Sequence, residues 1–224
     1  MTKIGAITVG QSPRVDVIPE MEPILGDSFE ILQMGGLDGL SKEEIAAFKP
    51  RENDHILVSR LTDGSSVTFG ESYILPRLQD CIHKLEENGA SLILFLCTGE
   101  FPENFDSKVP LIFPNRILSA VVPALIPGGR LTVLTPSAAQ TEQTERKWKQ
   151  LVSSVTVLPA SPYDGTAAVL KKAAEIRPEE TDLIVLDCIG YTMEMKEQIH
   201  QLTGKPVILP RTLTARVIRE LGDA

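Results

Sequence analysis

Cysteine, histidine and aromatic residues are scarce in this chain of 224 residues, which has three cysteines, three histidines and one tryptophan. No C-x-x-C or H-x-x-x-H pair occurs, and this spacing argues against a zinc site. We therefore expect no metal and no cofactor. An odd and sparse set of cysteines in a chain without an export signal predicts reduced thiols and a cytoplasmic location.

Two further absences exclude whole classes of partner. There is no cluster of lysine and arginine, and the formal net charge is −8, so we expect no nucleic-acid partner. No run of 18 apolar residues occurs, so we expect no membrane partner. The first ten residues, MTKIGAITVG, lack a longer apolar core and a cleavage site, and we expect a first strand there rather than a signal peptide.

What is present is an ordinary globular mixture, with 42% hydrophobic and 23% charged residues. Short apolar runs alternate with amphipathic stretches, which is typical of βα units and a parallel, doubly wound α/β fold. A hairpin with its turn at Asp63-Gly64 interrupts the alternation. The strands are predicted at 3–9, 29–35, 91–97, 130–136, 155–160 and 182–188, and helices at 41–48, 71–89, 141–152, 164–176 and 192–204.

The two halves of the chain are similar to each other. VPLIFPNRILSAVVPAL (109–125) aligns with KPVILPRTLTARVIREL (205–221), and both of their aligned prolines are offset by 96 residues (206 − 110 and 210 − 114). Each segment reads as a strand, a proline and an amphipathic helix. We therefore predict two pseudo-symmetric, flavodoxin-like lobes, each with a parallel sheet, and a cleft between them.

Two cysteines follow buried-looking strands at matched places in this duplication. LILFLCTGE (92–100) contains Cys97, and LIVLDCIGY (183–191) contains Cys188. Ligands of open α/β sheets bind beyond the carboxyl ends of the strands, so the two thiols are expected to face one another across the cleft. Cys81 instead lies on the apolar face of a predicted helix, and we interpret it as core packing.

Opposed thiols suit proton transfer at a carbon next to a carboxylate, with one sulfur as base and the other as acid. Backbone N–H groups and hydroxyls in the loops after the strands would stabilise the charge that develops, and an arginine would pair with a carboxylate. Helix capping is the alternative role for the same residues. The candidate substrate-binding residues are Gly10, Gln11, Ser12, Arg14, Thr98, Gly99, Thr135, Ser137, Gly190 and Tyr191.

These features resemble the aspartate/glutamate/hydantoin racemase superfamily. Within it, TVGQSPRVDVIPEM (8–21), MGGLDGLSKEEI (34–45) and LDCIGYTMEMKEQI (186–199) are similar to the AroM family over nearly the full length. The resemblance implies that Cys97 and Cys188 are the catalytic acid/base pair. It also implies a first lobe of about 1–115 plus 208–224 and a second lobe of about 116–207.

The sequence departs from the racemase pattern at two places. Ile189 follows the second cysteine where the racemases usually have threonine, and Gln11-Ser12 replaces their Asp-Ser pair. Asp187, directly before Cys188, would either raise the pKa of the thiol or form a hydrogen bond with a turn. These departures weaken the case for an amino acid as the substrate, but they leave the two cysteines in place.

Three functions stay open from the sequence. The first is a cofactor-independent racemase or isomerase of a small carboxylate, which uses both cysteines. The second is a non-catalytic binder of a small anionic metabolite in the same cleft. The third is a lyase or decarboxylase with one catalytic cysteine on the same fold. A homodimer is compatible with this fold, although no interface pattern indicates one.

Overall fold

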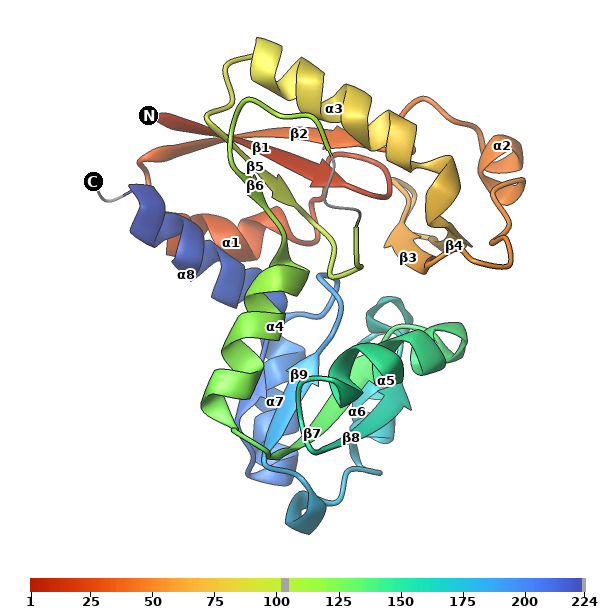
Figure 1. Cartoon of the computed structure of the whole chain (residues 1–224), viewed down its shortest axis with the longest axis vertical. Coiled ribbons are helices and arrows are strands. Elements are labelled where there is room, and N and C mark those ends of the chain that lie inside the picture. Colours follow the sequence, from red (N-terminus) through yellow and green to blue (C-terminus); the bar gives the residue numbers. More distant parts are fainter. Residues whose placement is uncertain (102–104, 223–224) are drawn as a thin grey trace. The chain divides into compact units, whose positions relative to one another are not determined.

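The computed structural model describes residues 1–101 and 105–222. It divides into two compact units: unit 1 contains Met1–Pro114 and the residues from Thr214 onward, and unit 2 contains Asn115–Leu213. Each unit is built on a four-stranded sheet in which all strand pairs are parallel (Figure 1). The prediction of an α/β fold with two parallel sheets is confirmed.

The sheet of unit 1 has the strand order β2-β1-β5-β6, and a separate antiparallel hairpin, β3-β4, has its turn at Asp63-Gly64 as predicted. The strands are β1 (Thr2–Thr8), β2 (Phe29–Gly35), β3 (Ile56–Arg60), β4 (Ser66–Gly70), β5 (Leu92–Phe95) and β6 (Leu111–Ile112). The helices are α1 (Ile18–Leu25), α2 (Lys42–Ala46), α3 (Leu75–Glu87) and the C-terminal part of α8 (Pro210–Gly222).

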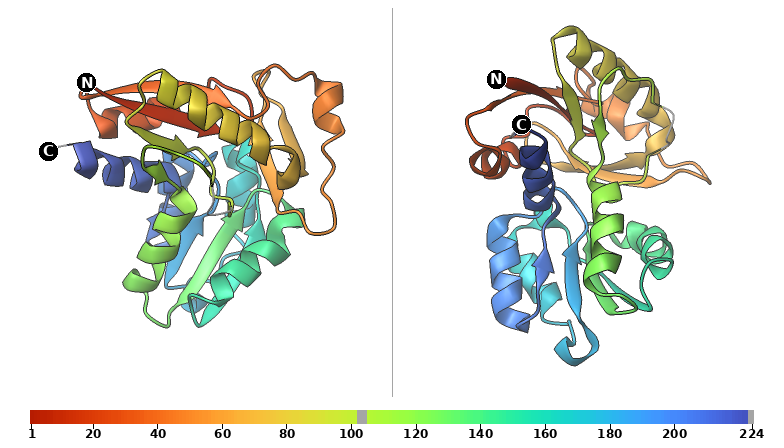
Figure 2. Two further views of the ribbon diagram at one scale, coloured as in Figure 1. Left: turned by 45° about the horizontal axis from the view of Figure 1, so that its top comes forward. Right: turned by 60° about the vertical axis from the view of Figure 1, so that its left-hand side comes forward.

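Helices cover both faces of the unit 1 sheet. The apolar face of α3 packs with strand residues in one core cluster, because its buried residues Leu78, Ile82 and Leu85 recur at helical spacing. α3 is followed by Gly89, whose φ of +85° suits glycine, as the sequence predicts. Figures 1 and 2 show α1 and the end of α8 on the opposite face, where Arg219 donates to the carbonyl of Ile24.

The sheet of unit 2 has the strand order β10-β9-β7-β8. Its strands are β7 (Arg130–Thr135), β8 (Ser154–Pro159), β9 (Leu183–Leu186) and β10 (Val207–Ile208). Its helices are α4 (Pro114–Leu125), α5 (Thr141–Lys149), α6 (Thr166–Ala173), α7 (Met193–Thr203) and the start of α8, and the short 3₁₀ helix η3 (Pro162–Asp164) follows β8.

Two separate apolar clusters pack against the two faces of this sheet. On one face, α6 and α7 contribute Val169 and Ile199 to a cluster that contains Leu186 of β9. On the other face, α4 and α5 contribute Leu118 and Trp148. Both faces of β9 are therefore covered, which explains why its sequence is a continuous apolar run rather than an alternating one.

The two units have the same topology. Numbered by their order along each unit, the strands of both sheets are arranged 2-1-3-4, which is the flavodoxin-like order. The third strands end in the same register: the N–H of Leu96 donates to Ile7, and the N–H of Asp187 donates to Leu134. Cys97 and Cys188 follow these two residues, so they occupy equivalent positions in their own units.

Candidate functional site

Each cysteine loop holds its sulfur in the same local geometry. The backbone N–H of Gly99 donates to Sγ of Cys97 over 3.3 Å, and the N–H of Gly190 donates to Sγ of Cys188 over 3.4 Å. Both sulfurs lie just beyond the carboxyl end of a central strand. An N–H donor two residues later stabilises a thiolate more than a thiol, because hydrogen bonds to charged acceptors are stronger.

Cys188 has a second polar neighbour in unit 2. The hydroxyl oxygen of Tyr163 lies 3.9 Å from Sγ of Cys188, within hydrogen-bonding range of sulfur. Cys188 itself is 6% exposed, whereas Tyr163 is half-buried. The phenol thus covers the sulfur on one side and reaches the surface of the unit.

Asp187, the residue before Cys188, is buried, and its carboxylate accepts hydrogen bonds from two side chains. Lys147 Nζ and Trp148 Nε1, both on α5, each lie 2.9 Å from its Oδ2 atom. Of the two roles that the sequence left open for Asp187, the structure shows hydrogen bonding, but the partners are side chains of a helix rather than a turn. The lysine places a positive charge against the carboxylate directly behind the Cys188 loop.

Ile189 is held by a buried arginine. Arg211 is 0% exposed, and its Nε and Nη2 atoms donate to the carbonyl oxygen of Ile189 over 3.0 and 2.7 Å. The side chain of Ile189 is itself buried. The position therefore contributes a carbonyl that fixes the loop, and the apolar side chain packs in the interior of the unit.

Cys97 packs against apolar side chains of unit 1. It is half-buried and packs against the core cluster that contains Phe95 and Phe113, whose rings stack with centroids 4.4 Å apart. The position of a Cβ on Gly99 would be 3.0 Å from Leu57, which shows how closely the hairpin approaches this loop. Thr98 is buried beside the cysteine.

The loop after β1 carries four predicted residues, and hydrogen bonds join it to neighbouring loops. The carboxylate of Asp38 accepts hydrogen bonds from the N–H and the hydroxyl of Ser12 (2.7 and 2.6 Å) and from the N–H of Gly35. The side chain of Gln11 accepts from Thr62 in the turn of the hairpin. The two segments that resemble the AroM family, around GQSPR and GLDGLS, therefore meet at Asp38.

Gly10 lies where the loop touches the hairpin. A Cβ at this position would come within 2.5 Å of the carbonyl oxygen of Arg60 and still closer to the side chain of Ser59. Backbone cannot move aside cheaply, so only glycine fits here. This loop, the hairpin and the Gly35–Asp38 segment form one connected group in unit 1.

Arg14 is paired inside the protein. It is 2% exposed, and its Nε and Nη2 atoms form a bidentate pair with Asp16 at 2.8 Å each, while Nη1 donates to Thr8. Burial raises the pKa of Asp16, but the hydrogen bonds and charge of Arg14, with help from Arg60, outweigh it and hold the pKa below its ordinary value. The geometry expected for a substrate carboxylate is thus realised with an internal one.

Of the four substrate-binding residues predicted in unit 2, Gly190 contacts the Cys188 sulfur, to which its N–H donates. The other three form hydrogen bonds elsewhere in the unit. The hydroxyl of Thr135 is buried and contacts that of Thr144, and Ser137 caps the turn that follows β7. Tyr191 is fully buried with its hydroxyl donating to the carbonyl of Ala160, and burial raises its pKa well above the ordinary value. Its side chain packs in the core of unit 2.

Cys81 differs from the other two cysteines, as predicted. It lies within α3, is part of the apolar core of unit 1, and burial raises the pKa of its thiol to about 11. A thiol with so high a pKa is protonated at neutral pH and is a poor nucleophile or base. This residue serves as an internal reference for the two loop cysteines.

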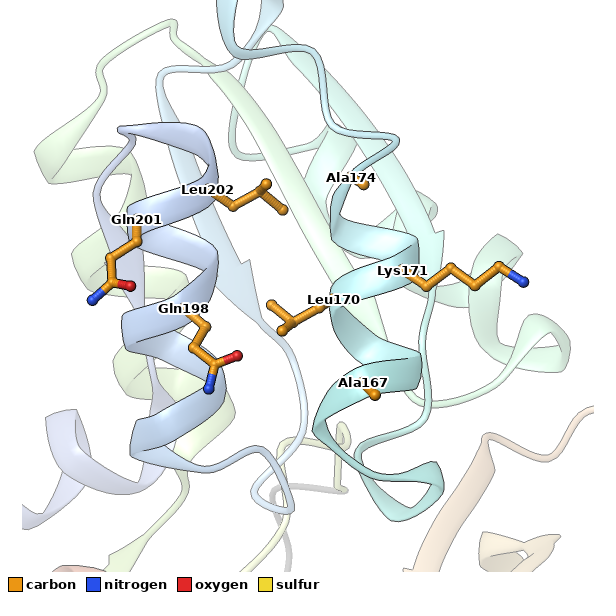
Figure 3. A pocket seen from close by; sticks show the side chains of 7 residues that line it. All are labelled: Ala167, Leu170, Lys171, Ala174, Gln198, Gln201 and Leu202. Atoms are coloured by element: carbon orange, nitrogen blue, oxygen red, sulfur yellow. The ribbon is translucent and has the colours of Figure 1, made fainter.

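An open groove of about 700 Å³ lies between α6 and α7 (Figure 3). It is lined by two leucines, two alanines, two glutamines and Lys171, and it contains none of the predicted site residues. Its polar lining residues are two glutamines and one lysine, with no cysteine, histidine or carboxylate among them, so it lacks the groups of an acid/base site. Figure 3 shows Leu170 and Leu202 directed toward each other across this groove.

In 1–101 and 105–222, no three His, Cys, Asp or Glu side chains are grouped so that they could hold a metal ion. No helix in the same ranges is long and apolar enough to cross a membrane.

The AroM protein family matches residues 4–222 of this sequence. The chain belongs to the AroM family. The match agrees with the resemblance of the segments around Ser12, Asp38 and Cys188 to this family. The first two of these segments are in contact, because Ser12 donates two hydrogen bonds to Asp38. A comparison with curated proteins gave no match.

Solved structures with the same fold include one isomerase and two racemases. Maleate cis-trans isomerase of Nocardia farcinica matches with a TM-score of 0.65 at 17% identity, over 100% of this chain and 93% of its own. Allantoin racemase of Klebsiella pneumoniae gives 0.65 at 16%, over 99% and 87%. Aspartate racemase of Picrophilus torridus gives 0.62 at 14%, over 100% and 95%. At these identities the likeness establishes the fold of this AroM-family chain.

Sequence reasoning missed Tyr163, Lys147 and Arg211, which all contact the Cys188 loop or its neighbour Asp187. One available signal would have found Tyr163. It follows β8, and the carboxyl ends of parallel strands meet at one edge of a sheet. Lys147 and Arg211 lie within amphipathic helices, where the sequence alone gives a lysine or an arginine no special meaning.

Proposed function

We propose that this AroM-family protein is a cofactor-independent isomerase or racemase of a small carboxylate, with Cys97 and Cys188 as the acid/base pair. The observation that carries the proposal is the repeated geometry of the two sulfurs. In two units of identical topology, each sulfur follows the third strand and accepts an N–H from the glycine two residues later. The folds shared with maleate isomerase and two racemases support the same reaction class.

The chemistry balances with these two groups alone. One sulfur, as thiolate, takes the proton from the carbon next to the carboxylate and becomes a thiol. The other sulfur, as thiol, gives its proton to the opposite face of that carbon and becomes a thiolate. Backbone N–H groups in the loops stabilise the negative charge that develops on the carboxylate oxygens between the two transfers.

The test is isotope exchange in heavy water. A panel of amino acids, hydantoins and 2-substituted acids is incubated with the protein, and mass spectrometry measures deuterium at the carbon beside the carboxyl group. We expect exchange with at least one compound, and a loss of about 10²–10⁴-fold in Cys97→Ser and in Cys188→Ser, the usual contribution of a general acid or base. Cys81→Ser is the matched control and should keep full exchange. Full exchange in the double variant of Cys97 and Cys188 would refute the proposal.

A second candidate is a non-catalytic binder of a small anion. It is favoured by Ile189, which carries no hydrogen-bonding side chain, and by Arg14, which is occupied by Asp16. It predicts that a compound from the same panel raises the melting temperature equally in the wild type and in the double cysteine variant, with no exchange in either. Retention of turnover in only one of the two single variants would instead indicate a lyase or decarboxylase with one catalytic cysteine.

A further inference from the structure

The two cysteine loops match in their backbone, and the structure describes a different neighbour for each sulfur. Cys97 packs against the cluster that contains Phe95 and Phe113, and Leu57 approaches its loop. The phenol hydroxyl of Tyr163 lies 3.9 Å from the sulfur of Cys188. This hydroxyl is placed to act on the charge state of Cys188.

The position of Tyr163 is built into unit 2. The hydroxyl of Ser161 accepts a hydrogen bond from the N–H of Tyr163 and so caps η3. The phenol then lies directly over Gly190, where a Cβ would come within 2.8 Å of its oxygen and 2.9 Å of two ring carbons. Glycine at 190 therefore serves two purposes: it donates its N–H to the sulfur, and its missing side chain lets the phenol approach.

We propose that Tyr163 is a positioning residue for Cys188, and that its hydroxyl donates to the sulfur and favours the thiolate form. While Cys188 is a thiol, either group can donate. Once the proton has left, the sulfur has no donor, so the phenol must donate, and the hydrogen bond becomes charge-assisted. Together with the N–H of Gly190, two donors then hold the anion.

The other charged groups near Cys188 must be included in this balance. Asp187 disfavours a second negative charge, but Lys147 neutralises it from α5. Arg211 from α8 brings a positive charge to the neighbouring carbonyl of Ile189, which favours the thiolate. Tyr191 stays neutral, because its hydroxyl donates to Ala160 and its pKa is raised. Tyr163 is thus a side chain of unit 2 that acts on the sulfur directly.

The catalytic purpose of this hydrogen bond rests on the proposed function. Before substrate binds, Cys188 would be the thiolate that acts as base, and Cys97 would be the thiol that acts as acid. The charge state of Cys188 can be measured without a substrate, so the effect of Tyr163 on it can be tested even if the proposed reaction is wrong.

The experiment is an NMR titration of protein labelled with ¹³C at the cysteine Cβ atoms. Three resonances are expected and are assigned with Cys81→Ser, Cys97→Ser and Cys188→Ser; each reports thiol or thiolate without a reagent that must reach the sulfur. In Tyr163→Phe, which keeps the ring over Gly190, we expect the titration midpoint of Cys188 to rise by about one pH unit, the effect of losing one hydrogen bond to a charged group. The midpoint of Cys97 should not move.

A merely structural role for the ring would leave the Cys188 midpoint unchanged in Tyr163→Phe, and that result would overturn the inference. If this variant fails to fold, Ser161→Ala tests the same point, because it loosens the cap that places the phenol and should move the midpoint in the same direction by a smaller amount. An unchanged or lowered midpoint there would equally overturn it. If the wild type exchanges no deuterium with any compound of the panel but Tyr163→Phe shifts the Cys188 midpoint as expected, the result would count against the proposed function alone.

Discussion

Lys147 and Asp187 form a nearly buried ion pair in unit 2, with Nζ 2.9 Å from Oδ2 and side chains that are 7% and 5% exposed. The equivalent position of Asp187 in unit 1 is Leu96, whose N–H makes the corresponding ladder bond. One copy of the fold therefore has an apolar residue before its cysteine, and the other has a compensated charge. Burying a charge is costly without a partner, so the two residues of the pair depend on each other.

We predict that Lys147→Met destabilises the protein by about 3–5 kcal/mol, because it leaves the Asp187 carboxylate buried without its cation. Adding Asp187→Leu, which copies unit 1, should restore part of this stability, since apolar replacement of a buried ion pair is often neutral. The recovery is incomplete because Trp148 Nε1 loses its acceptor. The free energy of unfolding is measured by urea denaturation followed by circular dichroism. Lys149→Met on the same helix is the control and should change it by less than about 0.5 kcal/mol. Additive effects of the two buried substitutions would contradict the prediction.

The two loop glycines should respond differently to alanine. At Gly190 the new Cβ meets the phenol of Tyr163 at 2.8–2.9 Å, whereas at Gly99 it meets the end of the Leu57 side chain at 3.0 Å. A leucine methyl can move more easily than a ring fixed by its own cap. We expect Gly190→Ala to cost about 1–3 kcal/mol and Gly99→Ala less than about 1 kcal/mol, as overpacking does at rigid and yielding sites. Thermal melts of the two variants compare them directly, and equal losses would refute the argument.

Asp16 should contribute to stability in a pH-dependent way. Its pKa in the folded protein lies below the ordinary value. A carboxyl group of this kind contributes stability that is present above its unfolded pKa, about 4, and is lost as the pH falls through the folded value. We therefore expect Asp16→Asn to be less stable than the wild type at pH 7, and the difference to shrink below about pH 4. Urea denaturation at several pH values tests this.

The control for that series is Asp27→Asn, at an exposed position that follows α1. Its difference from the wild type should be small and nearly independent of pH. A constant difference for Asp16→Asn across the acid range would mean that the pairing with Arg14 does not lower the pKa of Asp16 enough to matter. The variant would then be interpreted as a loss of packing and hydrogen bonds only.

Much of the fold was predictable because its signals are local. The continuous apolar runs before Cys97 and Cys188 predicted strands covered on both faces, and β5 and β9 are such strands. The capping box of Ser41 and Glu44 is present at α2, and Asp63-Gly64 forms the expected hairpin turn. Even the duplication was visible, since the strand-proline-helix segments became β6 with α4 and β10 with α8.

The site was predictable only in part. Strand ends identify which residues lie at the carboxyl edge of a sheet, and both cysteines with their following glycines lie there. The partners of polar side chains do not. Arg14 looked available for a substrate, but the sequence could not show that Asp16, two residues later, would turn back onto its guanidinium. A pair so close in sequence forms only because the loop after β1 has the required shape.

By itself the sequence determined the class of fold, its doubling, and the placement of two cysteines at strand ends, because hydrophobic periodicity and turn residues act over a few neighbouring positions. Tertiary structure decided the surroundings of Cys188. Tyr163 and Lys147 reach Cys188 and Asp187 across 25 and 40 residues of chain. Contacts of this kind exist only when helices and strands pack in one arrangement, so no local pattern encodes them.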